Sequence, residues 1–134
     1  MQKVNRRTFL KGAAWSAAVC AVPTIIPATA FGANERIALG CIGVGGMGTG
    51  NMRNFLAADG CRVVAVCDVY KPHLERGIEA GNNPDAKRYA NYRDLLADPQ
   101  VEAVVIAAPD HWHEQMAIDA SNAGKAVYCE KGMS

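Results

Sequence analysis

Beyond residue 36, hydrophobic residues form short runs of strand length that alternate with longer stretches in which apolar positions recur at helical spacing. This alternation is typical of a parallel sheet whose strands are connected by helices. The expected strands span residues 37–42, 62–67, 87–90, 103–107 and 126–129. The expected helices span residues 46–58, 72–80, 92–97 and 110–123. The pattern therefore predicts an α/β fold.

Residues at the ends of these segments agree with the expected boundaries. Pro72 suits the first turn of a helix, and Asp110 suits an N-cap. Gly81 and Gly124 suit helix ends. The strand segments are apolar on both faces, which predicts a sheet covered by helices on both sides. About a hundred residues can bury one modest core, so residues 31–134 are expected to form one domain.

The first thirty residues have the composition of an export signal. The basic segment NRRTFLK contains Arg6 and Arg7, an apolar run follows at 13–26, and Ala28-Thr29-Ala30 is a small-residue cleavage site. The apolar run is shorter than the roughly twenty residues of a membrane-spanning helix. The paired arginines resemble a twin-arginine signal, which predicts export to the periplasm or the exterior. The alternatives are an uncleaved signal that stays as an anchor and an amphipathic segment without a targeting role.

The whole-chain net charge of +1 combines two unlike segments. Residues 1–30 carry four basic and no acidic side chains. The remaining residues carry ten basic and thirteen acidic side chains, a net charge of −3. A mildly acidic domain without a cluster of Lys and Arg is a poor candidate for nucleic-acid binding.

The cysteines predict buried thiols and not disulfides. Cys20 lies in the signal, and the other four lie in or beside the apolar strand segments, at Cys41, Cys61, Cys67 and Cys129. A buried free cysteine behaves as a small hydrophobic residue. No CxxC pair occurs, so the spacing supports neither a zinc site nor a redox pair.

A glycine-rich loop, GVGGMG, directly follows the first expected strand and opens a helix. Its GxGxxG spacing is formed by Gly43, Gly45 and Gly48, with Gly46 in the same loop. In a dinucleotide site the first glycine permits a tight turn, the second lets the backbone approach the pyrophosphate, and the third lets helix and strand pack closely. The amino terminus of the helix then offers unpaired N–H groups to the phosphates. The context predicts a Rossmann-like, doubly wound parallel sheet with a dinucleotide site.

Asp68 follows the second expected strand, twenty residues after Gly48. A carboxylate at this place accepts hydrogen bonds from the ribose hydroxyls of the adenosine. It would also repel a 2′-phosphate, which favours NAD over NADP, while the nearby Lys71 keeps NADP as an alternative. The competing hypotheses are a glycine-rich turn that binds no nucleotide and a methyltransferase that binds S-adenosylmethionine. The combination of glycine spacing, strand-to-helix context and Asp68 disfavours the first, and three glycines at dinucleotide spacing disfavour the second.

The segment PDHWH, residues 109–113, follows the fourth expected strand. Ligands of open α/β sheets bind beyond the carboxyl ends of the strands, which would place Pro109, His111, Trp112 and His113 near the nicotinamide end of a cofactor. The alternative roles are polar residues at a helix start for the histidines and a hydrophobic cover of the sheet for Trp112. The HxH pair does not predict a metal site, because the remaining histidine, His73, lies in a different loop.

Together these motifs resemble the glucose-fructose oxidoreductase/inositol dehydrogenase (Gfo/Idh/MocA) family. The motifs are GVGGMG, Asp68, PDHWH and the terminal GKAVYCEKG, in the order and spacing of the family over about residues 35–134. The resemblance implies a Rossmann domain that binds NAD(P) and a second domain that binds a sugar or polyol. The implied reaction is hydride transfer between the nicotinamide and a carbon that bears a hydroxyl. Exported members of the family also carry twin-arginine signals.

The family motif Glu-Lys-Pro corresponds to Glu130-Lys131-Gly132 in this chain. The resemblance implies that Lys131 reaches the reaction centre, with Glu130 beside it at the cofactor. A lysine there would stabilise charge on the reacting oxygen or help to move its proton. Gly132 replaces a residue of fixed φ by the most flexible one, which is expected to loosen the turn. Without the resemblance, Lys131 would be interpreted as an exposed lysine after a strand.

The resulting hypothesis is the NAD(P)-binding domain of a sugar or polyol oxidoreductase. Its sheet is expected to be incomplete and its substrate domain absent, so that the chain is a fragment without turnover of its own. The alternative is a non-catalytic dinucleotide-binding or interaction module that docks to a separate substrate domain. The pattern leaves the oligomeric state open, with a homo-oligomer as one alternative.

Overall fold

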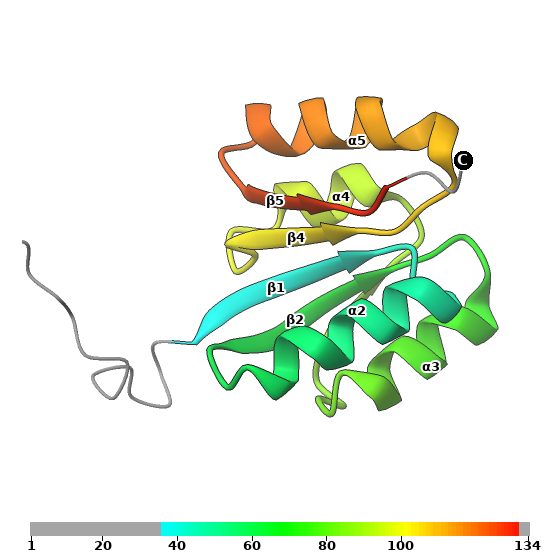
Figure 1. The fold of residues 1–134 in the computed structure, drawn as a ribbon, viewed down its shortest axis with the longest axis vertical. Coiled ribbons are helices and arrows are strands. Elements are labelled where there is room, and N and C mark those ends of the chain that lie inside the picture. The colour runs from blue at the N-terminus through cyan, green and yellow to red at the C-terminus, as the bar shows by residue number, and fades with distance from the viewer. Residues whose placement is uncertain (1–35, 132–134) are drawn as a thin grey trace, which may run out of the picture. The chain divides into compact units, whose positions relative to one another are not determined.

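The computed structural model describes residues 36–131, which form a parallel sheet with helices on both faces (Figure 1). The strands are β1 (Ile37–Ile42), β2 (Cys61–Cys67), β3 (Lys87–Tyr89), β4 (Ala103–Ile106) and β5 (Ala126–Cys129). The helices are α2 (Gly46–Ala57), α3 (Lys71–Ala80), α4 (Tyr92–Ala97) and α5 (Asp110–Asn122). The strand order is β3-β2-β1-β4-β5, and every neighbouring pair is parallel. The predicted Rossmann-like α/β fold is confirmed.

The central strand β1 divides the core into two apolar layers. Successive side chains of a strand point to opposite faces of the sheet. Ala38 and Ile42 therefore join the layer that contains the buried residues of α4 and α5. Leu39 and Cys41 join the other layer, with the buried residues of α2 and α3. The predicted helical cover on both faces is confirmed for β1, β2 and β4, whereas no residue of the edge strand β3 is buried.

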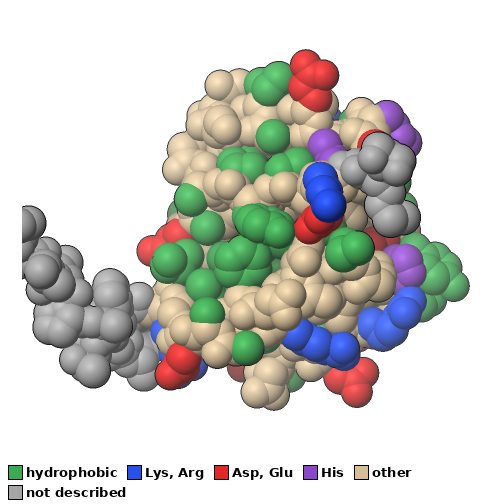
Figure 2. Space-filling model, in the orientation of Figure 1, with side chains coloured by type: hydrophobic (Ala, Val, Ile, Leu, Met, Phe, Trp, Pro, Cys, Tyr) green, Lys and Arg blue, Asp and Glu red, His purple; other side chains and the backbone are tan. Residues whose placement is uncertain are grey.

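The edge strand β5 departs from the expectation of a strand buried on both faces. All four of its residues are exposed, and Tyr128 makes an edge-on contact with the ring of Phe55 from α2, with 5.1 Å between ring centroids. Figure 2 shows hydrophobic side chains gathered at the centre of this face. The strand is exposed because β4 alone pairs with it among the described residues.

The cysteines divide according to their strands. Cys41 and Cys67 lie in the buried central strands, and burial raises the pKa of each thiol to about 12. The prediction of buried thiols is confirmed for these two. It is wrong for Cys129, which is exposed because β5 lies at the edge of the sheet, and Cys61 is only half-buried at the start of β2.

The predicted helix boundaries agree with the structure to within one residue, but Asp110 is not an N-cap and Gly81 does not take the left-handed conformation of a helix-ending glycine. Asp110 is the first residue of α5 and not its N-cap, because the extended backbone of Pro109 occupies the cap position. At the end of α3, Gly81 keeps helical dihedral angles, and Asn82 takes the left-handed conformation with φ 49°. Gly124 has φ 71° just after α5, as a helix-ending glycine does.

The order of the strands reverses direction beside β1. The chain leaves β1 toward β2 and β3 on one side, and then crosses over to β4 and β5 on the other. Such a reversal beside β1 is where open α/β sheets bind ligands, outside the carboxyl ends of the strands. Within residues 36–131, no helix is long and apolar enough to cross a membrane. The expected signal at residues 1–30 lies outside the described residues.

Candidate cofactor site

Backbone hydrogen bonds bring the candidate residues together at the carboxyl ends of the strands. The N–H of Gly43 donates to the carbonyl of Cys67 at 2.8 Å, immediately before Asp68. The N–H of Glu130 donates to the carbonyl of Ile106 at 2.8 Å, which extends the β4–β5 ladder past the end of β5. The N–H of Ala107 donates to the carbonyl of Ile42 at 2.9 Å and joins the ends of β4 and β1. The carboxyl ends of β1, β2, β4 and β5 are thereby held in register, and the predicted residues that follow them lie at the same end of the sheet.

Two glycines of the loop are required by close packing. Gly43 has φ 80°, and a Cβ added there would lie 2.6 Å from the carbonyl oxygen of Ala107. A Cβ on Gly48 would lie 1.8 Å from the carbonyl oxygen of Gly43. These contacts match the tight turn and the close helix–strand packing expected of the first and third glycines. Any side chain at either position would displace the loop from the sheet.

The other two glycines leave the backbone open to a ligand. A Cβ on Gly45 would meet only the ring of His73 within 4 Å, at 3.5 Å, and Gly46 has no neighbour within that distance. Helix α2 begins at Gly46 without a side-chain cap and without an acidic residue in its first turn. Its first N–H groups therefore keep their positive potential, and the loop fits a pyrophosphate.

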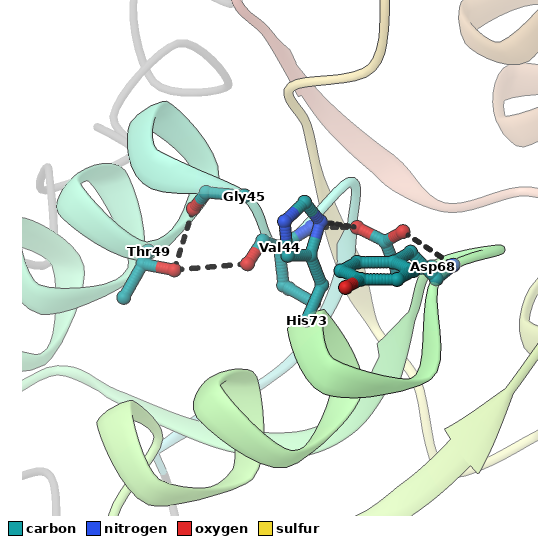
Figure 3. A network of polar contacts seen from close by, with 6 residues as sticks. Val44, Gly45, Thr49, Asp68 and His73 are labelled. Atoms are coloured by element: carbon teal, nitrogen blue, oxygen red, sulfur yellow. Dashed lines mark hydrogen bonds and ion pairs between the residues drawn. The ribbon is translucent and has the colours of Figure 1, made fainter.

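Thr49 stabilises the loop in this conformation. Its hydroxyl lies 3.0 Å from the carbonyl oxygen of Val44 and 2.6 Å from that of Gly45 (Figure 3). The hydroxyl donates its single hydrogen to this pair of oxygens. The contact ties the first turn of α2 back to the loop, so the open backbone of Gly45 and Gly46 is held before any ligand binds.

Asp68 is anchored to the glycine loop at the end of β2. Its Oδ2 accepts from the N–H of Val44 at 3.0 Å and contacts Nδ1 of His73 at 3.1 Å. Its Oδ1 accepts from the N–H of Tyr70 at 2.9 Å. A carboxylate has about four acceptor positions, so one remains for a ligand. Figure 3 shows the carboxylate and the His73 ring facing each other beside the loop.

The segment 109–113 turns from β4 into α5, and its side chains point in different directions. His113 is half-buried, and its Nε2 lies 2.6 Å from the carbonyl oxygen of Ala108, to which it donates. Trp112 is 42% exposed and packs edge-on against Tyr92 of α4, with 6.4 Å between centroids. His111 is exposed beside Trp112, and Pro109 caps the helix.

Glu130 is held by contacts with α2 and β5. Its Oε2 accepts from the side-chain amide of Asn51 at 2.8 Å and from the hydroxyl of Tyr128 at 3.3 Å. The hydrogen bond from Asn51 lowers the pKa of Glu130. Lys131 is exposed directly after it. Gly132, which is expected to loosen this turn, lies outside the described residues.

Residues 37–134 match the profile of the Gfo/Idh/MocA oxidoreductase family, described as an NAD-binding Rossmann fold. The chain belongs to this family. A glycosyl hydrolase family 109 protein of Shewanella baltica is 30% identical over 100% of this chain and 35% of its own length. An inositol 2-dehydrogenase of Salmonella typhimurium is 35% identical over 71% of this chain and 28% of its own length.

The structural comparison gives the same assignment. The crystal structure of a myo-inositol dehydrogenase from Lactobacillus casei, in complex with NAD(H) and myo-inositol, matches 72% of this chain with a TM-score of 0.67 and 29% identity. The match covers 28% of that protein. This Gfo/Idh/MocA domain therefore spans 28–35% of the length of these three relatives. It is an NAD-binding Rossmann domain.

Two contacts of this Gfo/Idh/MocA domain were missed by the sequence analysis. His73 was assigned to a different loop, but it lies in the first turn of α3, where its ring meets Asp68. Its position five residues after Asp68, one residue beyond a helix-starting proline, was a usable signal. The contact between Asn51 and Glu130 joins residues 79 positions apart, and no local pattern indicates it. No group of three or more metal-ligating side chains occurs among residues 36–131.

Proposed function

We propose that this chain supplies the cofactor site of an oxidoreductase that transfers hydride between NAD and a hydroxyl-bearing carbon of a sugar or polyol. The observation that carries the proposal is the open backbone of Gly45 and Gly46, held beside the anchored carboxylate of Asp68. The open loop would receive the pyrophosphate, and the remaining acceptor position of Asp68 would receive a ribose hydroxyl. When bound, the nicotinamide would supply the hydride chemistry.

The segment that follows β4 would receive the nicotinamide end. Gly43 packs against the carbonyl of Ala107, so the glycine loop and the turn that leads to Pro109, His111, Trp112 and His113 adjoin. The hydrogen bond from Nε2 of His113 to Ala108 would stabilise this turn. A carbohydrate-like substrate is supported by two relatives of the chain, an inositol 2-dehydrogenase and a glycosyl hydrolase family 109 protein.

We assign the catalytic contribution of this chain to Lys131. Asn51 and Tyr128 hold the carboxylate of Glu130, and its N–H is fixed to β4. The exposed ammonium of Lys131 would then lie just beyond the carboxyl end of β5, where it would donate to the reacting oxygen and stabilise its charge.

Asp68→Asn is expected to weaken NADH binding about tenfold, because an amide replaces one acceptor oxygen and removes the charge that Val44, His73 and the ribose contact. Titration of NADH fluorescence would measure this loss. The control is Glu79→Gln on α3, an exposed acid that should leave the affinity unchanged. Absence of saturable NADH binding by the unaltered chain at millimolar concentration would contradict the proposal. A turnover assay with polyols, carried out on a longer chain that includes a substrate domain, would separate it from the non-catalytic module, which predicts binding without turnover.

We further propose that the protein is exported by the twin-arginine route to the periplasm or exterior. The support is the segment NRRTFLK followed by an apolar run and Ala28-Thr29-Ala30. Cell fractionation is expected to find the mature chain, beginning near residue 31, outside the cytoplasm. Replacement of Arg6 and Arg7 by lysine should retain it inside. Export that persists in this double variant would contradict the assigned route.

A further inference from the structure

We propose that His73 acts with Asp68 to select NAD over NADP, and that the degree of selection depends on whether the His73 ring carries one or two protons. The proposal rests on the cofactor site proposed above. It assigns a role to a side chain that no motif of the chain includes.

The geometry fixes one proton of the ring. Nδ1 of His73 lies 3.1 Å from Oδ2 of Asp68. An ionised carboxylate only accepts hydrogen bonds, so Nδ1 must carry a hydrogen. The side chains of His73 and Asp68 are 31% and 10% exposed, respectively. The pair is therefore packed, and the ring of His73 keeps part of its surface open to a ligand.

The second ring nitrogen, Nε2, is the atom whose protonation can change. Nε2 of His73 makes no hydrogen bond to any residue of the described chain. The ring borders the glycine loop, with Cε1 at 3.5 Å from the Cβ position of Gly45. It is also held edge-on against Tyr70, with 5.0 Å between centroids. Nε2 is thus a fixed polar atom beside the acid that would bind the ribose.

Protonation changes Nε2 of His73 from a hydrogen-bond acceptor into a donor. With one proton on the ring, Nε2 accepts, which suits a ribose hydroxyl, and the pair with Asp68 keeps a net negative charge that repels a 2′-phosphate. With two protons, Nε2 donates, the pair is neutral, and a phosphate is tolerated. Acidification adds the second proton to an imidazole, so the preference is expected to differ between alkaline and acidic solution.

Among the charged side chains near the His73 ring, Asp68 is the one in contact with it. The glycine loop meets the ring with backbone only, at Gly45. On α3, Glu75 is engaged by Arg88 of β3. Lys71 is exposed at the start of α3.

The test is isothermal titration calorimetry of the whole chain with NAD⁺ and with NADP⁺ at pH 8.0 and pH 5.5. We expect the preference of the unaltered chain for NAD⁺ to fall about tenfold between the two, the scale of a charge-assisted hydrogen bond. The 2′-phosphate itself takes up a proton near pH 6, and this contributes to the fall. The variant His73→Asn isolates that contribution, because its amide can still donate to Asp68 but does not titrate.

In His73→Asn we expect NAD⁺ to bind at pH 8.0 and the change in preference to shrink to that of the phosphate alone. His73→Gln is a second variant that does not titrate, and Glu79→Gln should respond to pH as the unaltered chain does. An unchanged pH response in both His73 variants would overturn the role of His73 and leave the cofactor site standing. Failure of the unaltered chain to bind NAD⁺ at pH 8.0 would overturn the cofactor site and, with it, the role of His73.

Discussion

Gly48→Ala is expected to destabilise the domain by about 3 kcal/mol and to abolish measurable NADH binding. The new Cβ would lie 1.8 Å from the carbonyl oxygen of Gly43 and 3.3 Å from the Cβ of Ala107, so no flexible side chain is present to move away. Either α2 or the loop must shift, and the loop contacts of Thr49 and Asp68 depend on both. Urea denaturation and NADH fluorescence would measure the two effects.

The matched control is Gly50→Ala in the same helix. A Cβ on Gly50 would have no neighbour within 4 Å. Alanine there should stabilise the domain by up to about 1 kcal/mol, because it restricts the unfolded chain and favours the helix. If both alanine variants bound NADH as the unaltered chain does, the close packing of Gly48 would not be what holds the phosphate loop.

Asp98→Ala is expected to lower the free energy of unfolding by about 2 kcal/mol. Asp98 is 5% exposed, and its Oδ2 accepts from Nζ of Lys87 at 2.8 Å and from the hydroxyl of Tyr89 at 2.9 Å. Its Oδ1 accepts from the N–H of Gln100 at 2.9 Å. Alanine would leave these donors without their acceptor. The loss is moderated because Lys87 is 49% exposed and can turn to water.

The same carboxylate should make stability depend on pH. The hydrogen bond from Lys87, followed by that from Gln100, lowers the pKa of Asp98 from 3.8 to about 2. A carboxyl whose folded pKa is lowered stabilises the fold above its unfolded pKa, and this contribution is lost as pH falls through the folded pKa. About 2 kcal/mol should disappear between pH 4 and pH 2.

Urea denaturation at a series of acidic pH values would show this loss in the unaltered chain and its absence in Asp98→Ala. Asp85→Ala, at an exposed turn position, is the control and should keep the acid-dependent loss. An equal slope in the Asp98 variant and the unaltered chain would contradict the assignment of the acid sensitivity to this carboxylate.

The periodic pattern located the strands and helices because their apolar residues face a core whose geometry repeats. The strand at 37–42 was found with its observed bounds, and the helix at 92–97 likewise. Individual end residues were less well predicted. Asp110 has the chemistry of a cap, but Pro109 already sets the extended backbone that precedes α5. The choice between adjacent residues depends on backbone dihedral angles that composition does not encode.

Burial at the sheet edge was the largest misjudgement. The run AVYC resembles a buried strand in composition, and Cys129 was therefore expected inside. Its exposure follows from the position of β5 in the sheet, because an edge strand has one neighbouring strand instead of two and, of the described helices, only α5 packs closely against it. Strand order is a property of the assembled sheet, so apolar composition alone could not reveal it.

The sequence by itself determined the α/β class, the glycine loop and the acid that follows β2, because each depends on residues close together along the chain. Only the tertiary structure decided how these parts meet. It brought the N–H of Val44 and the ring of His73 into hydrogen-bonding contact with Asp68, and the amide of Asn51 into contact with Glu130. These contacts arise from packing helices onto a parallel sheet, which brings distant residues to the carboxyl ends of its strands.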